Sequence, residues 1–275
     1  MGTAKETGRL SLSAEELLNV QGLEKRFGGI LALVDYHLSL KREDLLGIIG
    51  PNGAGKTTVF NLLSGVLKPT AGRIVFAGED ITHARPDQNS ASGIARTFQN
   101  VRVFGEMSVI DNIKVGFHRR LGADLWSTLA HLPRFRRSER AMDEQALEIL
   151  ELTGLITMRH ELAMNLPYGL QRRLEIGRAL AAGPQLLLLD EPSAGMNPQE
   201  TLELIQIIGL IHRKYHLTIL LVEHDMSVVM SICQRIQVLD RGRVLTLGTP
   251  AEVQNDQRVI EAYLGAPKAD GHASN

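Results

Sequence analysis

The sequence lacks several features that mark other classes of protein. Its 275 residues include one cysteine, Cys233, which excludes an intramolecular disulfide framework and suits a reducing compartment. No run of 18 or more apolar residues offers a membrane span, and the first residues lack the apolar core of a secretory signal. The net charge of −1 gives no sign of a nucleic-acid-binding surface. These absences predict a cytoplasmic protein that acts on a membrane only through a partner.

The composition is that of an ordinary globular protein. Hydrophobic residues make up 44% and charged residues 22%, and the length suits one large domain or two small ones. The pattern shows no repeat of 20–50 residues, no coiled-coil heptads and no low-complexity block. The polar residues 1–14 and 266–275 are expected to be tails around a folded unit at 15–265.

The strongest local signal is Gly50-Pro51-Asn52-Gly53-Ala54-Gly55-Lys56-Thr57-Thr58, which fits the phosphate-binding pattern G-x-x-x-x-G-K-[ST]. It lies between a short apolar strand at 45–49 and a helix expected over 57–67, the context that the motif needs. The glycines let main-chain N–H groups surround phosphates, and the helix N-terminus adds positive potential. Lys56 places a cation on the β- and γ-phosphates, and the Thr57 hydroxyl suits Mg²⁺. The alternative, a glycine-rich turn with a chance lysine, leaves the flanking strand and helix unexplained.

A second signal is a run of four leucines, residues 186–189, which ends in Asp190 and Glu191. The run predicts a strand buried on both faces, as in a parallel sheet. Ligands bind at the carboxyl ends of such strands, so Asp190 is placed to hold Mg²⁺ and Glu191 to polarise an attacking water. The alternative is an acidic pair that caps a helix or lies in a loop.

Single residues elsewhere are weaker candidates. Phe27 precedes a Gly-Gly turn, where it is either a half-buried strand residue or a platform for a purine base. Gln99 ends a strand expected at 95–99, and His224 follows another at 217–223, where contact with a γ-phosphate is feasible. The alternatives are a solvated loop amide for Gln99 and a structural role for His224. Pro167 and Gly169 open a helix, whose first N–H groups can face an anion.

The pattern predicts an α/β fold. Alternating apolar residues at 17–27 and 32–40 predict antiparallel strands before the phosphate-binding loop. Helical spacing dominates residues 100–165, which we interpret as an inserted helical subdomain between the core segments 15–99 and 166–265. The basic segment 131–137 permits a nucleic-acid contact, but a solvated face or a contact with a partner or lipid headgroups fits the near-neutral chain better.

Taken together, the motifs resemble those of the ATP-binding subunits of ABC transporters, and more narrowly the Liv-type ATPases of bacterial branched-chain amino acid importers. The resemblance covers about residues 17–265. It is carried by residues 25–29 (KRFGG), 50–58, 96–100 (RTFQN), 166–173 (LPYGLQRR), 189–192 (LDEP), 222–225 (VEHD) and 262–265 (AYLG). It implies a P-loop NTPase core with a parallel sheet, an antiparallel β-subdomain and a helical subdomain.

The resemblance also implies roles for single residues. Phe27 matches the aromatic that stacks on adenine, and Gln99 matches the Q-loop glutamine, which touches Mg²⁺ and reports to the membrane subunits. Asp190 and Glu191 match the Walker B aspartate and the catalytic glutamate, and His224 matches the switch histidine. Residues 193–197 match the D-loop. In this family two such subunits enclose two ATP molecules, and the signature segment of one closes over the P-loop of the other.

One motif departs from the commonest family pattern. The usual signature is Leu-Ser-Gly-Gly-Gln, whereas residues 166–170 here are Leu-Pro-Tyr-Gly-Leu, which lacks the serine hydroxyl. Gly169 and the helix N-terminus remain as donors, beside Tyr168. Losing one neutral hydrogen bond costs about 0.5–1.5 kcal/mol, which slows closure rather than abolishing it. We interpret the variant as a trait of the Liv-type group.

The resemblance implies an ATP-hydrolysing subunit at the cytoplasmic face of the inner membrane. Its expected partners are two transmembrane permeases, a second ATP-binding subunit of the same or a related kind, and, indirectly, an external substrate-binding protein. Another amino acid, urea or an amide is an alternative cargo. A soluble ABC ATPase in nucleic-acid or ribosome work is a remote alternative, since such proteins usually carry tandem cassettes or long coiled coils. A nucleotide-binding scaffold without turnover is a third, which Glu191 and His224 disfavour.

Overall fold

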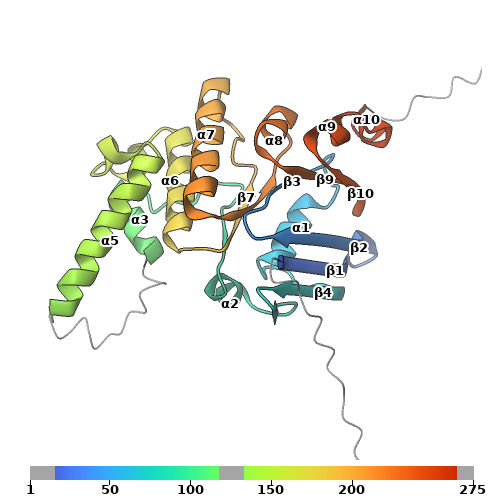
Figure 1. Cartoon of the computed structure of the whole chain (residues 1–275), viewed down its shortest axis with the longest axis horizontal. Coiled ribbons are helices and arrows are strands. Elements are labelled where there is room, and N and C mark those ends of the chain that lie inside the picture. The colour runs from blue at the N-terminus through green and yellow to red at the C-terminus, as the bar shows by residue number, and fades with distance from the viewer. Residues whose placement is uncertain (1–15, 118–132, 265–275) are drawn as a thin grey trace, which may run out of the picture.

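A computed structural model describes residues 16–117 and 133–264 of the chain (Figure 1). Two sheets form the centre: a six-stranded sheet in the order β10-β9-β3-β8-β7-β6 and a four-stranded sheet in the order β2-β1-β4-β5. The expected tails, residues 1–14 and 266–275, lie outside the described residues.

The six-stranded sheet is parallel except for its β10 edge. β3 (Leu45–Ile49) lies between β8 (Thr218–Val222) and β9 (Arg235–Asp240), and β7 (Leu186–Asp190) lies between β8 and β6 (Ile94–Arg96). β10 (Arg243–Gly248) pairs antiparallel with β9. All residues of β3, β7 and β8 are buried, which confirms the predicted two-sided burial of the leucine run.

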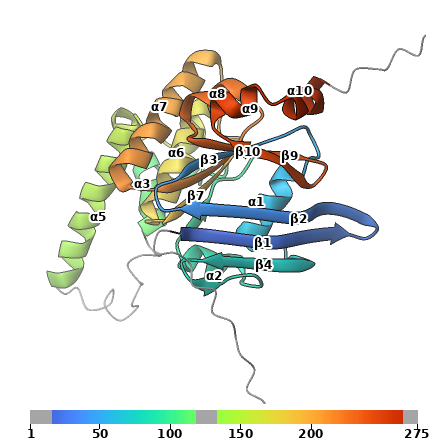
Figure 2. The ribbon, with the colours of Figure 1, turned by 45° about the vertical axis from the view of Figure 1, so that its right-hand side comes forward.

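The four-stranded sheet is antiparallel, as predicted. β1 (Glu16–Phe27) pairs with β2 (Ile30–Lys41) and β4 (Ala71–Phe76), and β5 (Glu79–Asp80) extends the edge. α1 (Lys56–Leu63) packs between this sheet and one face of the large sheet (Figure 2), where Phe60 and Leu63 are fully buried. α2 (Pro86–Ala91) follows β5.

Helices cover the other face of the large sheet (Figure 1). The first group comprises α3 (Val109–Phe117), α5 (Pro133–Leu152), the 3-10 turns η1 (Ile156–Met158) and η2 (Ala163–Asn165), and α6 (Tyr168–Ala181). α7 (Pro198–Tyr215), α8 (Met226–Ile232), α9 (Pro250–Gln254) and α10 (Gln257–Leu264) complete the chain. Of the basic segment, residues 131–132 lie outside the described residues and 133–137 begin α5. None of the helices in the described ranges has the length and apolar character to cross a bilayer.

Two predicted boundaries are wrong, for local reasons. The helix after the phosphate-binding loop ends at Leu63, because the Ser64 hydroxyl donates back to Phe60 O at 2.7 Å and Gly65 takes a positive φ of 77°. The strand predicted at 95–99 ends at Arg96. The main-chain carbonyls of Phe98 and Gln99 bond to the Arg172 side chain, so Gln99 lies in a loop beyond the sheet.

Candidate nucleotide-binding site

The phosphate-binding loop joins β3 to α1 and packs tightly on main chain. A Cβ at Gly50 would lie 2.1 Å from Leu239 O of β9, and a Cβ at Gly55 would lie 3.0 Å from Ala32 O of β2. Gly50 and Gly55 have φ values of 152° and 108°, so the backbone conformation and the lack of room for a Cβ both require glycine. Gly242 N donates to Ala54 O at 2.9 Å and closes the loop against the β9–β10 turn.

Lys56 is the first residue of α1, and its side chain turns back into the loop. Nζ donates to Gly50 O at 2.7 Å and to Pro51 O at 3.0 Å. Burial lowers the pKa of Lys56, while the charges of Glu191 and Asp190 oppose that shift. The first turn of α1, which is described in full, contains no acidic residue, so the positive potential of its N-terminus is uncompensated there. The loop therefore presents a cation and a helix N-terminus in one place.

Asp190 ends β7 and is 2% exposed. Its Oδ2 accepts from Arg96 Nη2 at 2.8 Å, and its main-chain N–H donates to Thr97 Oγ1 at 3.3 Å. The other guanidinium nitrogen, Nη1, donates to Asn61 Oδ1 of α1 at 2.7 Å and to Ser64 Oγ at 2.9 Å. Arg96 thus ties the Asp190 carboxylate to the helix that carries Lys56.

Glu191, Gln99 and His224 meet from three separate loops. Gln99 Nε2 donates to Glu191 Oε2 at 3.2 Å, and His224 Nδ1 lies 3.9 Å from the same oxygen. Glu191 has a positive φ of 46°, and its N–H donates to Val222 O at 2.9 Å. Strained backbone of this kind, at the end of a buried strand, is typical of functional sites. The arrangement places a carboxylate, an amide and an imidazole around one point.

The remaining predicted residues lie farther out. Phe27 ends β1, is 45% exposed and has Lys25 Nζ 5.1 Å from its ring centroid. Thr57 is exposed and Thr58 half-buried in the first turn of α1. Tyr168 and Gly169 start α6, where the Tyr168 ring faces Gly195 of the D-loop. Within the described residues neither makes a hydrogen bond with the phosphate-binding loop.

Several residues of this region were not assigned a role from the sequence. Arg96 and Glu223 lie inside quoted motifs; Glu223 is fully buried, and its Oε1 accepts from Ser193 N at 2.9 Å and from Ser193 Oγ at 2.7 Å. Burial raises the pKa of the Tyr263 hydroxyl, and its hydrogen bond with the main chain of Gly50 opposes that shift. A charged side chain inside an apolar strand is the signal that could have indicated Arg96 and Glu223.

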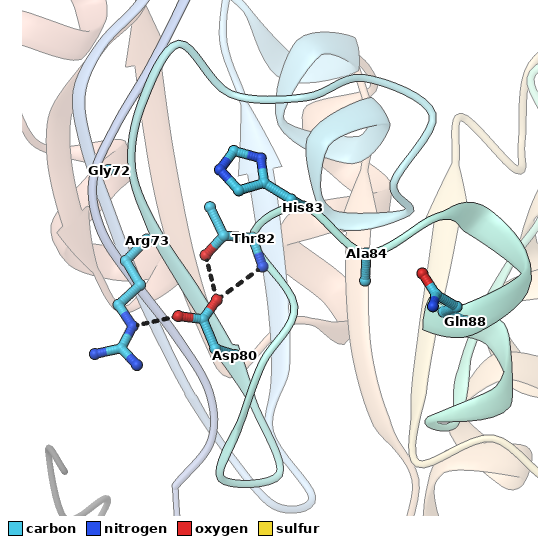
Figure 3. A pocket seen from close by; sticks show the side chains of 7 residues that line it. All are labelled: Gly72, Arg73, Asp80, Thr82, His83, Ala84 and Gln88. Atoms are coloured by element: carbon cyan, nitrogen blue, oxygen red, sulfur yellow. Dashed lines mark hydrogen bonds and ion pairs between the residues drawn. The ribbon is translucent and has the colours of Figure 1, made fainter. Parts of the chain in front are cut away.

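A hollow of about 620 Å³ lies at the opposite end of α1, lined by residues of 72–88. Its polar groups bind one another: Asp80 accepts from Arg73 Nε at 2.7 Å and from Thr82 Oγ1 at 2.6 Å (Figure 3). Lys68 Nζ also donates to His83 O, at 2.8 Å. These contacts hold the β4–α2 connection together.

A glycine-rich loop between a strand and a helix, its lysine, and two carboxylates at the end of a nearby parallel strand define a P-loop NTPase. The comparison with protein families gives the narrower class. The family described as "ABC transporter" matches residues 33–194, and the family described as "Branched-chain amino acid ATP-binding cassette transporter" matches residues 243–269. The chain belongs to the ABC transporter family, and it is an ATP-binding, ATP-hydrolysing cassette.

Individual relatives agree with this placement. The chain is 46% identical over 252 residues to "High-affinity branched-chain amino acid transport ATP-binding protein LivG" of Escherichia coli K12, which covers 92% of this chain and 99% of that protein. It is 32% identical over 249 residues to "Lipopolysaccharide export system ATP-binding protein LptB" of Haemophilus influenzae, which covers 90% and 97%. A nucleotide-free ATP-binding cassette from an ABC transporter superposes with a TM-score of 0.78 at 32% identity and covers 91% of this chain and all of that one.

Proposed function

We propose that the chain is the ATP-hydrolysing subunit of a bacterial importer of branched-chain amino acids. The observation that carries the hydrolytic part is the convergence of Lys56, Gln99, Glu191 and His224 at the carboxyl edge of one sheet. The cargo rests on the C-terminal family match and on the 46% identity to LivG. The same fold at 32% identity in a lipopolysaccharide export protein shows that fold alone does not decide cargo, so another amino acid, urea or an amide stays an alternative.

The site residues divide the work of phosphoryl transfer to water. The main-chain N–H groups of residues 52–58 and the Lys56 ammonium hold the β- and γ-phosphates, and the Phe27 ring stacks on the base. Glu191 orients and polarises the attacking water. The Gln99 amide holds Glu191 in place, because its Nε2 donates to Glu191 Oε2 at 3.2 Å. His224 contacts the γ-phosphate from the loop after β8. The rate gain comes mainly from positioning and from stabilising charge.

The donor set at this site fits Mg²⁺. Thr57 offers a hydroxyl, Gln99 an amide oxygen and Asp190 a carboxylate, which are the hard oxygen ligands that Mg²⁺ takes. Mg²⁺ at a nucleotide usually takes one or two protein ligands and completes its coordination with water and substrate phosphates. When bound, Mg²⁺ supplies positive charge to the β- and γ-phosphate oxygens. The Arg96 contact holds one oxygen of the Asp190 carboxylate, Oδ2, in place.

The proposal includes two permeases, and a groove of about 500 Å³ is the surface that suits them. It is lined in part by Phe98, Arg102 and Phe104. Phe104 is 48% exposed, and the Arg178 guanidinium lies 5.1 Å from its ring. An exposed aromatic with a flanking arginine is typical of interface anchors. One wall of this groove belongs to the loop that carries Gln99, so a permease helix seated there could influence Glu191. Docking of this kind places the chain at the cytoplasmic face of the inner membrane.

A second ATP-binding subunit completes each site in this proposal. Tyr168 is 44% exposed at the N-terminus of α6, on an outer surface rather than inside its own site. Such a surface is suited to cover the nucleotide of another subunit, with Gly169 and the first N–H groups of α6 as donors. An external substrate-binding protein would act on the permeases.

The test of the hydrolytic site is Mg²⁺-ATP-dependent dimerisation of the Glu191→Gln variant, followed by light scattering. The variant should bind ATP, hydrolyse it about 10²–10⁴-fold more slowly than wild type and accumulate as a closed dimer. Binding without dimerisation would indicate that a different ATPase or the permeases are required. A variant as active as wild type would overturn the role of Glu191.

The test of the cargo is uptake by cells that lack this chain. We expect them to lose uptake of radiolabelled leucine, isoleucine and valine, and to regain it with the wild-type chain but not with Glu191→Gln. Unchanged leucine uptake together with lost uptake of urea or an amide would change the assignment of the cargo and leave the assignment as an ATPase unchanged.

A further inference from the structure

Arg172, in the second turn of α6, has the largest completely buried side chain among the described residues. Its guanidinium points at main chain from a distant part of the sequence. Nη1 donates to Phe98 O at 2.5 Å and Nη2 donates to Gln99 O at 2.6 Å. Short, charge-assisted bonds of this kind are roughly twice as strong as neutral ones, so this side chain is the main attachment of both carbonyls.

Glu175, one turn later on the same helix, accepts hydrogen bonds from main-chain N–H groups of the same loop. Its Oε1 accepts from Phe98 N and from Arg102 N, each at 3.3 Å. Its Oε2 accepts from Arg172 Nη1 at 2.9 Å, and the two side chains are 0% and 2% exposed. The pair therefore holds the segment 98–102, which we name the Q-loop segment, by main-chain donors and acceptors together.

The attachment goes to α6 rather than to the sheet. β6 ends at Arg96, and the last bond between main-chain groups of this stretch and β7 in the described structure is Thr97 N to Leu188 O at 3.0 Å. Beyond it, Arg172 and Glu175 replace the sheet as the main-chain partner. The Q-loop segment is thereby carried by α6, whose N-terminal residues are Tyr168 and Gly169.

The same guanidinium reaches both ends of this arrangement. Arg172 Nη2 also donates to the hydroxyl of the exposed Tyr168, at 3.3 Å, while Gln99 turns its amide to Glu191 at 3.2 Å. Arg172 thus connects two places. One is the surface at Tyr168, which would cover a second subunit's nucleotide, and the other is Gln99, whose amide lies beside this chain's own Glu191. A displacement of the α6 N-terminus would be transmitted to Gln99 through two bonds.

We propose that Arg172, supported by Glu175, is a positioning residue for ATP hydrolysis: it holds the Q-loop segment on α6 so that Gln99 stays beside Glu191. The proposal rests on the role given above to Gln99. Because the pair touches neither the phosphate-binding loop nor Lys56 in the described structure, it should affect turnover and leave nucleotide binding intact.

The test uses the purified full-length chain with the variants Arg172→Gln, Arg172→Lys, Glu175→Gln and Gln99→Ala. For Arg172→Gln we expect kcat to fall about 10–100-fold with a change below about 3-fold in the KM for Mg²⁺-ATP and in the affinity for a fluorescent ATP analogue. Arg172→Lys keeps the charge but lacks the fork that reaches two carbonyls, so it should recover only part of kcat. Combining Arg172→Gln with Gln99→Ala should lower kcat no further than the slower single variant.

Hydrogen exchange supplies a reading that does not depend on turnover. The amides of Phe98 and Arg102 donate to Glu175 and should lose protection about 10-fold or more in Arg172→Gln and Glu175→Gln, while the amides of the phosphate-binding loop keep theirs. The matched control is Arg173→Gln. Arg173 is the next residue and is 8% exposed, but it pairs with Glu203 of α7. We expect it to keep kcat within about 3-fold and to leave Phe98 exchange unchanged.

Three results would overturn the proposal. They are wild-type turnover in Arg172→Gln, losses that multiply in the double variant, and a control that matches Arg172→Gln in both readings. If Gln99→Ala itself hydrolyses ATP at the wild-type rate, the role of Gln99 fails first and this inference fails with it. If Gln99→Ala is slow and Arg172→Gln is not, only this inference fails. Should Arg172→Gln not fold, Glu175→Gln and Arg172→Lys decide by the same criteria.

Discussion

The phosphate-binding loop and the Q-loop segment lie at the same edge of one sheet, yet they are built in opposite ways. The first is held by main chain packed on main chain, with Gly50 against Leu239 O and Gly55 against Ala32 O. The second is held by buried charged side chains, with Arg172 and Glu175 on residues 98–102 and Arg96 on Asp190.

The difference decides what each region tolerates. A loop that packs through its backbone fails when a side chain is added, because no atom nearby can move aside cheaply. A loop that is held by buried charges fails when a side chain is removed, because its partners are left desolvated and unpaired. Each prediction below removes or adds one group and is matched with a control at an otherwise similar position.

The largest effect is expected for Arg96→Gln. The Arg96–Asp190 pair is buried, with side chains 9% and 3% exposed, so removing the cation leaves a carboxylate without its counter-charge. We expect the free energy of unfolding to fall by about 3–5 kcal/mol, measured by urea denaturation. The control is Lys214→Gln, whose pair with Glu148 is about half exposed and should cost below about 1 kcal/mol. Equal losses would mean that burial does not distinguish the two pairs.

Gly50→Ala tests the main-chain half of the comparison. The new methyl group would sit 2.1 Å from Leu239 O, so β9 or the loop must shift. We expect a loss of about 2–4 kcal/mol of unfolding free energy and weaker ATP binding. Gly53→Ala is the matched control, because Gly53 also has a positive φ, 80°, but a Cβ there meets no atom within 4 Å. It should cost about 1 kcal/mol. A control as damaging as Gly50→Ala would assign the effect to φ rather than to packing.

The same contrast explains how far the sequence predicted the molecule. Strands β3, β7 and β8 and the β1–β2 hairpin follow from local apolar patterns, and the fold class was confirmed. The phosphate-binding loop is encoded within nine residues, so its motif alone predicted a loop between a strand and a helix, and Lys56 and Thr57 lie in the first turn of that helix.

The Q-loop segment could not be predicted in the same way. Gln99 was identified as a candidate, but it was predicted to end a strand, because Phe98 continues the apolar pattern of this stretch beyond Arg96. What ends the strand is a pair of side chains more than 70 residues later in the chain, Arg172 and Glu175, at sequence separations of 73–77 from the atoms they bind. No local pattern contains that information.

Asn112→Ala tests attachment by a neutral side chain, in the stretch that follows the Q-loop segment. Asn112 is fully buried in α3, and its amide binds both main-chain groups of Phe104 at 2.8 and 3.0 Å and Ser108 O at 3.0 Å. Removing it leaves these groups unpaired, and we expect a loss of about 1–3 kcal/mol of unfolding free energy. Asn255→Ala is the control, since its amide makes one exposed bond to Ala251 O and should cost below about 1 kcal/mol. A loss below about 0.5 kcal/mol for Asn112→Ala would contradict side-chain control of the stretch around Phe104.

The smallest effect concerns Cys233, which lies directly under the strand that leads into the phosphate-binding loop. Its Sγ would be 2.9 Å from a Cβ at Gly47, and burial raises the pKa of its thiol from 9.0 to about 12. Because the folded pKa lies above the unfolded one, the thiol's contribution to stability is complete below pH 9 and is lost as pH rises toward 12.

Between pH 8 and pH 10, wild type should therefore lose about 1.4 kcal/mol more unfolding free energy than Cys233→Ala, measured by urea denaturation at both pH values. Burial also raises the pKa of Tyr215, from 10.0 to about 12, but both proteins carry this residue, so it cancels in the difference. Parallel pH dependence in the two proteins would mean that water reaches the thiol, and that the strand under the loop is less closely packed than its main chain indicates. A steeper fall in wild type would show that the main-chain packing of the loop extends into the core beneath it.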